Sequence, residues 1–383
     1  MRFLHTADWH LGKLLHGVHL TDDQRVLLDQ LIDVAADAEP DLVIVAGDVY
    51  DRSVPPADAV ELLDDALSRI VLDLGIPVVA IAGNHDSPDR LDFGSTLLQR
   101  QQLYVYSKLR ADPGRLTLED EHGPVHVVGL PYAEPSRARN VFEDPSIKTH
   151  DGVLAAQAKS ARAALPDGDR SIAVGHVFTQ GGALADSERP LAVGGAETVH
   201  TSRFDGFDYV ALGHLHRRQK VGDPRIQYAG SLMKYSFNEV HHDKSAHLVE
   251  MDATGDCTIE RVPLTPQRDL RRLEGPLSEI LNGPAADEDP EDYLWVTLTD
   301  EGPVVDAMSR IRAVYPNALH VERTRQEDIR TLGSADGDVQ SQNVDAVFKQ
   351  FFEHVTDGDP LSDAHQDVLG DAIDRMQAAQ RDA

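Results

Sequence analysis

Several features that would place a chain in a familiar class are scarce or missing here. There is one cysteine, Cys257, which excludes a disulfide framework and a zinc site built on cysteine pairs. No apolar run approaches the roughly 20 residues that a membrane-spanning helix needs. The first strand-like segment begins almost at Met1, so no secretory leader is expected. These absences predict a cytoplasmic protein with no membrane partner.

Positive charge is also scarce. The formal net charge is −29 over 383 residues, and only eight of the 36 basic residues are Lys. Adaptation to high salt would account for the acidity, and a biased genome composition would account equally well for the excess of Arg over Lys. The acidity counts against a nucleic-acid partner. However, residues 217–234 hold five basic residues and one acidic residue, and Arg217, Arg218 and Lys220 belong to this patch.

The chain does contain five short polar motifs, each placed directly after a short apolar run. The runs are RFLHTA, DLVIVA, IPVVAIA, SIAV and YVAL, whose aliphatic and β-branched residues predict buried strands. The motifs are Asp8-Trp9-His10, Gly47-Asp48, Gly83-Asn84-His85-Asp86, Gly175-His176 and Gly213-His214-Leu215-His216. Ligand sites of open α/β sheets lie at the carboxyl ends of strands. Five strand ends that deliver Asp, Asn and His therefore predict a metal centre.

The order of predicted elements indicates an α/β fold with more than one domain. Strands at 2–7, 41–46 and 77–82 alternate with helices at 21–38 and 56–74, which predicts parallel pairing. Thr21 is the expected N-cap of the first helix, and Pro40 the expected stop. Further strands are expected near 125–130, 171–174, 208–212, 226–229 and 246–251. These elements make up a first domain at residues 1–265.

Composition changes after residue 265. A strand at 293–298, a helix at 303–314 and a strand at 318–323 predict a compact second α/β domain, residues 266–332. Residues 333–383 are expected to be a linker followed by helices at 343–355 and 362–378. The first of these helices has a Phe-rich stripe, which either packs on the rest of the chain or docks into a groove of a partner.

The side chains of the motifs suit a pair of divalent cations. Seven oxygen and nitrogen ligands are too many for one tetrahedral zinc, and they fit two ions roughly 3.5–4 Å apart. Because no thiolate is available, Mn²⁺ is expected first, then Fe or Mg²⁺. Each motif alone also occurs by chance, but five in order are hard to obtain by accident. The predicted ligands are Asp8, His10, Asp48, Asn84, His176, His214 and His216.

Four residues beside the ligands have predicted roles of their own. His85 is expected to act as general acid or charge stabiliser on the leaving oxygen of a phosphodiester, with a role as an eighth metal ligand the alternative. Asp86 is expected to orient His85, with a role as a turn cap the equal alternative. Arg52 and Arg90 are candidate phosphate contacts, with surface ion pairs the equal alternative.

These motifs together resemble those of the calcineurin-like metallophosphoesterases: D-x-H, GD-x-x-D (Gly47, Asp48, Asp51), GNHD, GH and GHxH. The flanking segments TADWHLGK, GNHDSPDRL, GHVFTQGG, YVALGHLHRRQ and YAGSLMKYSFNE resemble the SbcD family of bacterial nuclease subunits. The resemblance covers the whole chain. It implies a sandwich of β-sheets flanked by helices, a small DNA-facing capping domain at 266–332, and C-terminal helices that bind the coiled-coil ATPase SbcC.

The same resemblance implies which residues act and on what. One ion would be held by Asp8, His10, Asp48 and His216, the other by Asp48, Asn84, His176 and His214, with His85 the catalytic histidine. The implied activities are an ATP-dependent 3′–5′ exonuclease on double-stranded DNA ends and an endonuclease on single strands and hairpins. They would serve DNA repair, recombination and replication at the nucleoid.

The resemblance also implies partners. The chain has no nucleotide-binding loop, so the ATP dependence would come from SbcC, in a complex of two SbcC and two SbcD subunits. The SbcD subunits would pair through helices of the nuclease domain, for which 21–38 and 56–74 are available, with coverage of the sheet the equal alternative for both. Two alternatives stay open: an ordinary metallophosphoesterase acting on a nucleotide or phosphoprotein, and a subunit that mainly tethers DNA ends.

Overall fold

The computed structural model describes residues 1–183, 198–286, 288–300 and 304–324. The chain divides into two units, Met1–Thr324 and Arg325–Ala383. The second unit lies outside the described residues, and so do the predicted helices at 343–355 and 362–378.

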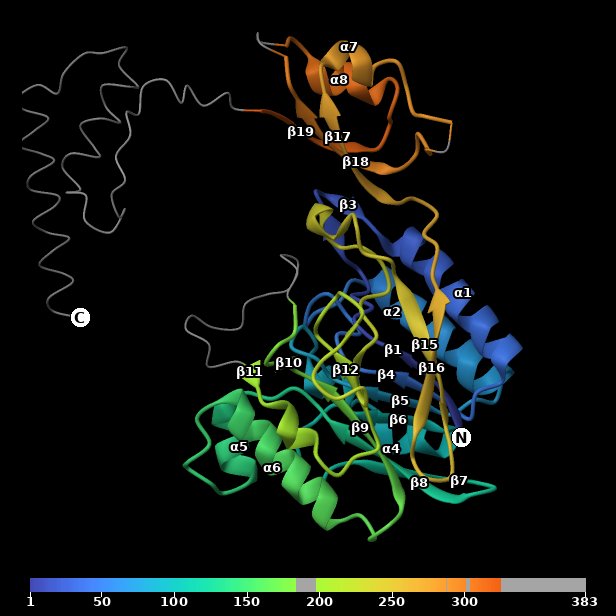
Figure 1. Cartoon of the computed structure of the whole chain (residues 1–383), viewed down its shortest axis with the longest axis vertical. Coiled ribbons are helices and arrows are strands. Elements are labelled where there is room, and N and C mark those ends of the chain that lie inside the picture. The colour runs from blue at the N-terminus through green and yellow to red at the C-terminus, as the bar shows by residue number, and fades with distance from the viewer. Residues whose placement is uncertain (184–197, 287, 301–303, 325–383) are drawn as a thin grey trace, which may run out of the picture. The chain divides into compact units, whose positions relative to one another are not determined.

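Two six-stranded sheets form the centre of the first unit (Figure 1). The first has the order β16-β15-β1-β4-β5-β6, in which β1, β4 and β5 run parallel as predicted, and β6, which the sequence did not predict, runs parallel to them. Its strands are β1 (Arg2–Thr6), β4 (Leu42–Val45), β5 (Val78–Ile81), β6 (Leu103–Tyr106), β15 (Ser245–Met251) and β16 (Cys257–Pro263). The antiparallel pairing of β15 with β1 returns the chain beside its own N-terminus.

The second sheet has the order β13-β14-β12-β9-β8-β7, with antiparallel edges around a parallel centre. Its strands are β7 (Arg115–Asp120), β8 (Gly123–Leu130), β9 (Arg170–His176), β12 (Tyr209–Gly213), β13 (Gln219–Lys220) and β14 (Ile226–Tyr228). Side chains such as Phe3 and Ile44 from the first sheet share one buried cluster with Val127 and Val174 from the second. The two sheets therefore pack face to face.

Helices cover the outer faces of both sheets. On the first sheet, α1 (Thr21–Ala38) and α2 (Ala57–Ser68) bury their apolar stripes in one cluster with the strands. On the second sheet, α6 (His150–Ala163) buries Leu154, Ala158 and Ala161. The result is the predicted α/β sandwich of sheets flanked by helices.

The ends of the first two helices differ from the sequence prediction. Leu20, not Thr21, occupies the N-cap of α1, and the Thr21 hydroxyl instead donates to the Asp58 carboxylate of α2 at 2.8 Å. The helix ends before Pro40, as expected, with Glu39 in the left-handed region (φ 45°). The α-helical part of the second helix, α2, ends at Ser68. A π-helical turn, Arg69–Asp73, follows it directly and ends before Gly75 (φ +71°).

A three-stranded parallel sheet follows, made of β17 (Leu270–Gly275), β18 (Tyr293–Leu298) and β19 (Ala318–Arg323). It packs against α7 (Leu277–Ile280) and α8 (Ala307–Arg312), which is shorter than the helix predicted at 303–314. The strand β17 escaped prediction because three of the six residues of its sequence, LRRLEG, are charged. The Arg268 guanidinium and the Tyr293 hydroxyl both donate to the buried Asp23 carboxylate of α1. These hydrogen bonds connect the three-stranded sheet to the helix that covers the first six-stranded sheet.

Short elements connect these layers. They are β2 (Leu14–Leu15), β3 (Val18–His19), α3 (Pro88–Leu91), α4 (Ser95–Leu98), η2 (Gln99–Gln101), α5 (Pro135–Val141), β10 (Phe178–Thr179), β11 (Thr198–Val199), η3 (Thr201–Phe204) and η4 (Phe237–Glu239). Among the described residues, no helix combines the length and the apolar content needed to cross a bilayer.

Candidate metal centre

The five polar motifs follow strands of both sheets, and hydrogen bonds join them across the two sheets. The His214 amide, after β12, donates to both oxygens of Asp8, after β1, at 2.9 and 3.1 Å. The His85 amide, after β5, donates to Asp48 Oδ1, after β4, at 2.8 Å. His176 Nδ1, at the end of β9, lies 2.9 Å from the carbonyl of Ala46, after β4. The sandwich therefore brings the carboxyl ends of β1, β4, β5, β9 and β12 to one place.

Two glycines of the motifs are required by this convergence. A Cβ on Gly83 would overlap the Asp48 carboxylate, and a Cβ on Gly213 would overlap the carbonyl oxygen of Ala46. A side chain at either position would push the strand ends apart. Gly83 and Gly213 thus serve close approach.

Backbone strain is concentrated at the same place. Among the described residues, nine that are not glycine have a positive φ, and four of them are predicted ligands. Residues held in this conformation cost free energy, and they cluster at functional sites. The four are Asp8 (φ 51°), His10 (φ 45°), Asp48 (φ 47°) and His214 (φ 99°).

One group of ligand atoms comes from Asp8, His10 and His216, all fully or almost fully buried. Their candidate ligand atoms lie within 4.8 Å of one another. His10 Nε2 lies 3.1 Å from His216 Nε2 and 3.6 Å from Asp48 Oδ2. This group contains the residues expected to hold the first ion.

A second group surrounds Asp48 and His176. His176 Nε2 lies 3.3 Å from Asp48 Oδ2 and 3.0 Å from Asn84 Oδ1. The same Asn84 oxygen lies 3.0 Å from His214 Nδ1. The residues expected to hold the second ion are thus together, and Asp48 lies between the two groups.

Burial sets the protonation of three of the four histidines. Burial lowers the pKa of His10 and of His216, and it lowers the pKa of His214 to about 3. Neutral imidazoles are the form that binds metals. Burial also opposes a charge on His176, but the carboxylates of Asp48 and Asp8 outweigh it and raise the pKa of His176 to about 9.

The contacts among these groups fit a cation. The carbonyl of Ala46 lies 2.9 Å from His176 Nδ1 and accepts its proton, so a metal ion that displaced the proton on Nε2 would meet a lone pair beside the Asn84 oxygen. Two buried carboxylates, Asp8 and Asp48, also need positive charge nearby. Divalent ions between these atoms would satisfy both the facing lone pairs and the carboxylates, which is the chemistry of the predicted donor set.

His85 and Asp86 make different contacts. His85 is buried, its Nε2 lies 4.0 Å from Asp48 Oδ2, and its Nδ1 lies 2.8 Å from the carbonyl of Asp51, which therefore orients the ring. The Asp86 carboxylate accepts the backbone N–H groups of Val49, Tyr50 and Gly83 at 2.9–3.1 Å. Such bonds are typical of a turn cap, the alternative role predicted for Asp86. They join the two loops that hold Asp48 and Asn84.

Sequence reasoning missed three supporting residues. Gln24 of α1 donates to the carbonyls of Trp9 and His10 and so fixes the first loop. Glu239 accepts from His216 Nδ1 at 3.2 Å, and Lys244 pairs with that carboxylate. The quoted segment YAGSLMKYSFNE contains Glu239, but nothing in its spacing shows that the side chain points to His216.

The predicted DNA contacts are exposed cations. Arg52, Arg90, Arg217, Arg218 and Lys220 have exposed side chains. None of the five forms an ion pair within the part of the chain that the structure describes. Arg52 follows the loop of Asp48, and Arg217 and Arg218 directly follow His216.

Comparison with known proteins bears on both parts of the chain. The model of the calcineurin-like phosphoesterase family matches residues 1–218, more than half of the chain. The SbcD_C model, described as the type 5 capsule protein repressor C-terminal domain, matches residues 266–356.

Three solved structures show distant similarity, each at 12% identity. TT1561 of Thermus thermophilus has a TM-score of 0.37 and covers 68% of this chain and 98% of its own. A dimetal phosphatase from Danio rerio has a TM-score of 0.38, with 69% and 98% covered. GAP50, the anchor in the inner membrane complex of Plasmodium, has a TM-score of 0.35, with 84% and 96% covered. These values are too low to carry an argument.

Proposed function

Because the chain belongs to the calcineurin-like phosphoesterases, a family of metal-dependent hydrolases, we propose that it is a DNA nuclease subunit of the SbcD type. The observation that supports this most is the combination of the two ligand groups within residues 1–218 and the SbcD_C match that begins at residue 266. The activities would be a 3′–5′ exonuclease on DNA ends and an endonuclease on single strands and hairpins. They would serve DNA repair, recombination and replication in the cytoplasm at the nucleoid.

In this proposal, each predicted ligand of the metal centre is assigned to one or both of two ions. Asp8, His10 and His216 would hold one ion, Asn84, His176 and His214 would hold the other, and Asp48 would be shared between them. The ions, Mn²⁺ in the first instance, would supply Lewis-acid activation of water and of the scissile phosphate. The protein keeps three of the imidazoles neutral by burial, so they are ready to bind.

His85 is the general acid. Its Nδ1 is committed to the carbonyl of Asp51, so in the neutral ring a proton on Nδ1 leaves Nε2 facing Asp48. Uptake of a second proton at Nε2 makes the ring a donor toward the centre. That proton would pass to the leaving oxygen of the phosphodiester. Asp86 has no proton-transfer role in this proposal, because its oxygens hold backbone N–H groups.

DNA would contact the cations at the rim of the site. Arg52, Arg90, Arg217, Arg218 and Lys220 would bind phosphates, which is the usual source of sequence-independent affinity. Because the chain as a whole is strongly acidic, these local cations would carry the electrostatic attraction. DNA binding should accordingly weaken steeply with salt.

In this proposal the chain has three parts, and the last of them binds the partner ATPase. Residues 1–265 are the nuclease domain, 266–332 the capping domain, and 333–383 the linker and helices that bind the ATPase SbcC. Deletion of 340–383 should abolish capture of SbcC in a pull-down while Mn²⁺-dependent hydrolysis of a small phosphodiester survives. Capture of SbcC by the shortened chain would contradict the assignment.

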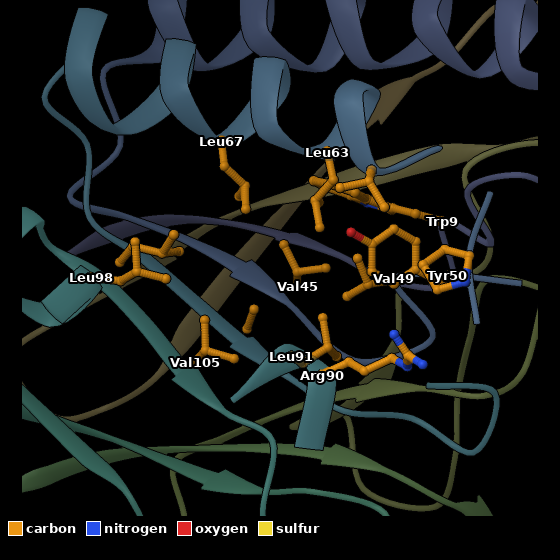
Figure 2. Close-up of a pocket in the computed structure, with 14 residues that line it drawn as sticks. Trp9, Val45, Val49, Tyr50, Leu63, Leu67, Arg90, Leu91, Leu98 and Val105 are labelled. Carbon is orange, nitrogen blue, oxygen red and sulfur yellow. The ribbon is translucent and has the colours of Figure 1, made fainter. Parts of the chain in front are cut away.

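An apolar surface beside α2 supports the proposed homodimer. Leu63 and Leu67 of α2 line a cavity of about 300 Å³ from one side, and Leu91 and Leu98 line it from the other (Figure 2). Arg90 is the single charged residue of the lining. Phe93 and Leu97, in the neighbouring segment, have exposed fractions of 86% and 72%, and Val60 and Leu72 are exposed too. Apolar surface of this kind marks interfaces, and a second copy would bury it within a complex of two SbcC and two SbcD subunits.

The decisive experiment is a cleavage assay on end-labelled duplex DNA with Mn²⁺, with and without the partner ATPase and ATP. Shortening of the duplex from its 3′ ends would support the proposal. Hydrolysis of nucleotides or phosphoproteins without DNA cleavage would point to an ordinary metallophosphoesterase. DNA binding without hydrolysis would point to a tethering subunit.

A further inference from the structure

One three-residue turn lies between the metal centre and the three-stranded sheet that follows residue 265. This turn is η4, Phe237–Glu239. Glu239 points from it toward His216, while the backbone of the same turn meets β17 of the small sheet. The turn therefore contacts both the metal centre and the small sheet. Neither the proposed catalytic roles nor the cavity beside α2 accounts for these contacts.

Toward the metal centre, Glu239 fixes one ring. Its Oε1 lies 3.2 Å from His216 Nδ1, and with the carboxylate ionised the ring nitrogen is the donor. His216 Nε2 is then left with its lone pair, 3.1 Å from His10 Nε2. A carboxylate that holds the far nitrogen of a metal-binding histidine sets both the tautomer and the orientation of the ring.

The charge of Glu239 is balanced locally. Glu239 is fully buried and forms an ion pair with Lys244, itself almost fully buried. Lys244 Nζ also donates to the carbonyl of His216 at 2.9 Å and to Ser231 Oγ at 2.8 Å. The carboxylate and the backbone of His216 are therefore held by the same ammonium group.

Toward the small sheet, the turn is held by one arginine. Arg272 of β17 donates from Nε to the carbonyl of Phe237 at 3.0 Å and from Nη2 to Asn238 Oδ1 at 2.6 Å. Its neighbour Arg271 makes its ion pairs within the small sheet's own loop, with Asp292 and Glu288. Arg272 is thus the residue of this pair that reaches the turn.

We propose that Glu239 is a positioning residue for His216 and that Arg272, by anchoring η4, couples the attachment of the small sheet to the affinity of one of the two metal ions. The ion concerned is the one next to Asp8, His10 and His216. The inference rests on the proposed function for the identity of these ligands. It adds a route by which displacement of residues 266–324 weakens metal binding without touching a ligand.

The test uses the full-length chain stripped of metal and titrated with Mn²⁺ by isothermal calorimetry. E239Q should weaken one of two Mn²⁺ sites by roughly 10–100-fold and leave the other unchanged, since loss of such a support typically costs that much. R272A should weaken the same site by less. The double variant should match E239Q alone, because Arg272 acts through Glu239.

Two matched variants serve as controls. R271A alters the adjacent residue of the same strand, and E250Q alters an exposed glutamate that pairs with exposed Arg2. Both should bind Mn²⁺ as the wild type does. Because Arg272 is exposed, R272A should fold even if the buried E239Q change disturbs the structure.

The outcomes separate this inference from the proposed function. Two wild-type affinities in E239Q, or equal affinities in R272A and R271A, would overturn the inference while the metal centre stands. Weakening of both sites to the same degree would also overturn it, because it would indicate general destabilisation. A wild-type chain that binds no Mn²⁺ would overturn both.

Discussion

Replacement of His85 by Gln tests the proposed chemistry most directly. The ring nitrogen Nδ1 is held by the carbonyl of Asp51, and Nε2 lies 4.0 Å from Asp48 Oδ2, on the side of the ligand groups. Gln is similar in length but cannot transfer a proton. A general acid contributes roughly 10²- to 10⁴-fold to a rate, which corresponds to about 3–5 kcal/mol of transition-state stabilisation. Cleavage of DNA should therefore fall by a factor in this range.

A comparison of two leaving groups makes the assay specific for the general-acid role of His85. The alkoxide that leaves DNA is a strong base and needs a proton, whereas the 4-nitrophenolate that leaves bis(4-nitrophenyl) phosphate does not. His85→Gln should therefore slow DNA cleavage far more than hydrolysis of the nitrophenyl ester, with Mn²⁺ content unchanged. His122→Gln, at an exposed turn distant in sequence from every motif, should affect neither. Equal losses on both substrates would refute the acid role, and loss of metal would show that His85 acts as a ligand.

Three further perturbations test other parts of the structure. His176→Ala should lower Mn²⁺ content by about one ion per chain by elemental analysis, and unchanged content would contradict the ligand set. Gly213→Ala should lower the free energy of unfolding in urea by about 1–3 kcal/mol, because the new Cβ overlaps the Ala46 carbonyl and lies 2.9 Å from His176 Nδ1. In Gly175→Ala the nearest atom to the new Cβ is the end of the Leu212 side chain at 3.1 Å, so equal losses in the two variants would disprove the close convergence. Phe93→Glu should convert a dimer to a monomer in analytical ultracentrifugation, and a persisting dimer would exclude this surface.

The local pattern of the sequence was sufficient to predict most of the strands that position the metal-binding motifs. The strands β1, β4, β5, β9 and β12 are short apolar runs, and burial on both faces favours such runs in parallel sheets. The polar motifs lie at the carboxyl ends of these strands, where open α/β sheets place their ligand sites. The charged strand β17 and the antiparallel partner β16 were missed because their residues are mostly not buried, so no apolar pattern marks them.

The sequence by itself determined which side chains could bind metal, since the motifs supply Asp, Asn and His at strand ends and no thiolate. Only the tertiary structure decided what surrounds each of them. The carbonyl of Asp51 lies 2.8 Å from His85 Nδ1 and orients the ring, and Glu239 supports His216 from 23 residues away. Such contacts depend on how two sheets and the loops between them pack, and packing distances between distant segments leave no periodic trace in the sequence.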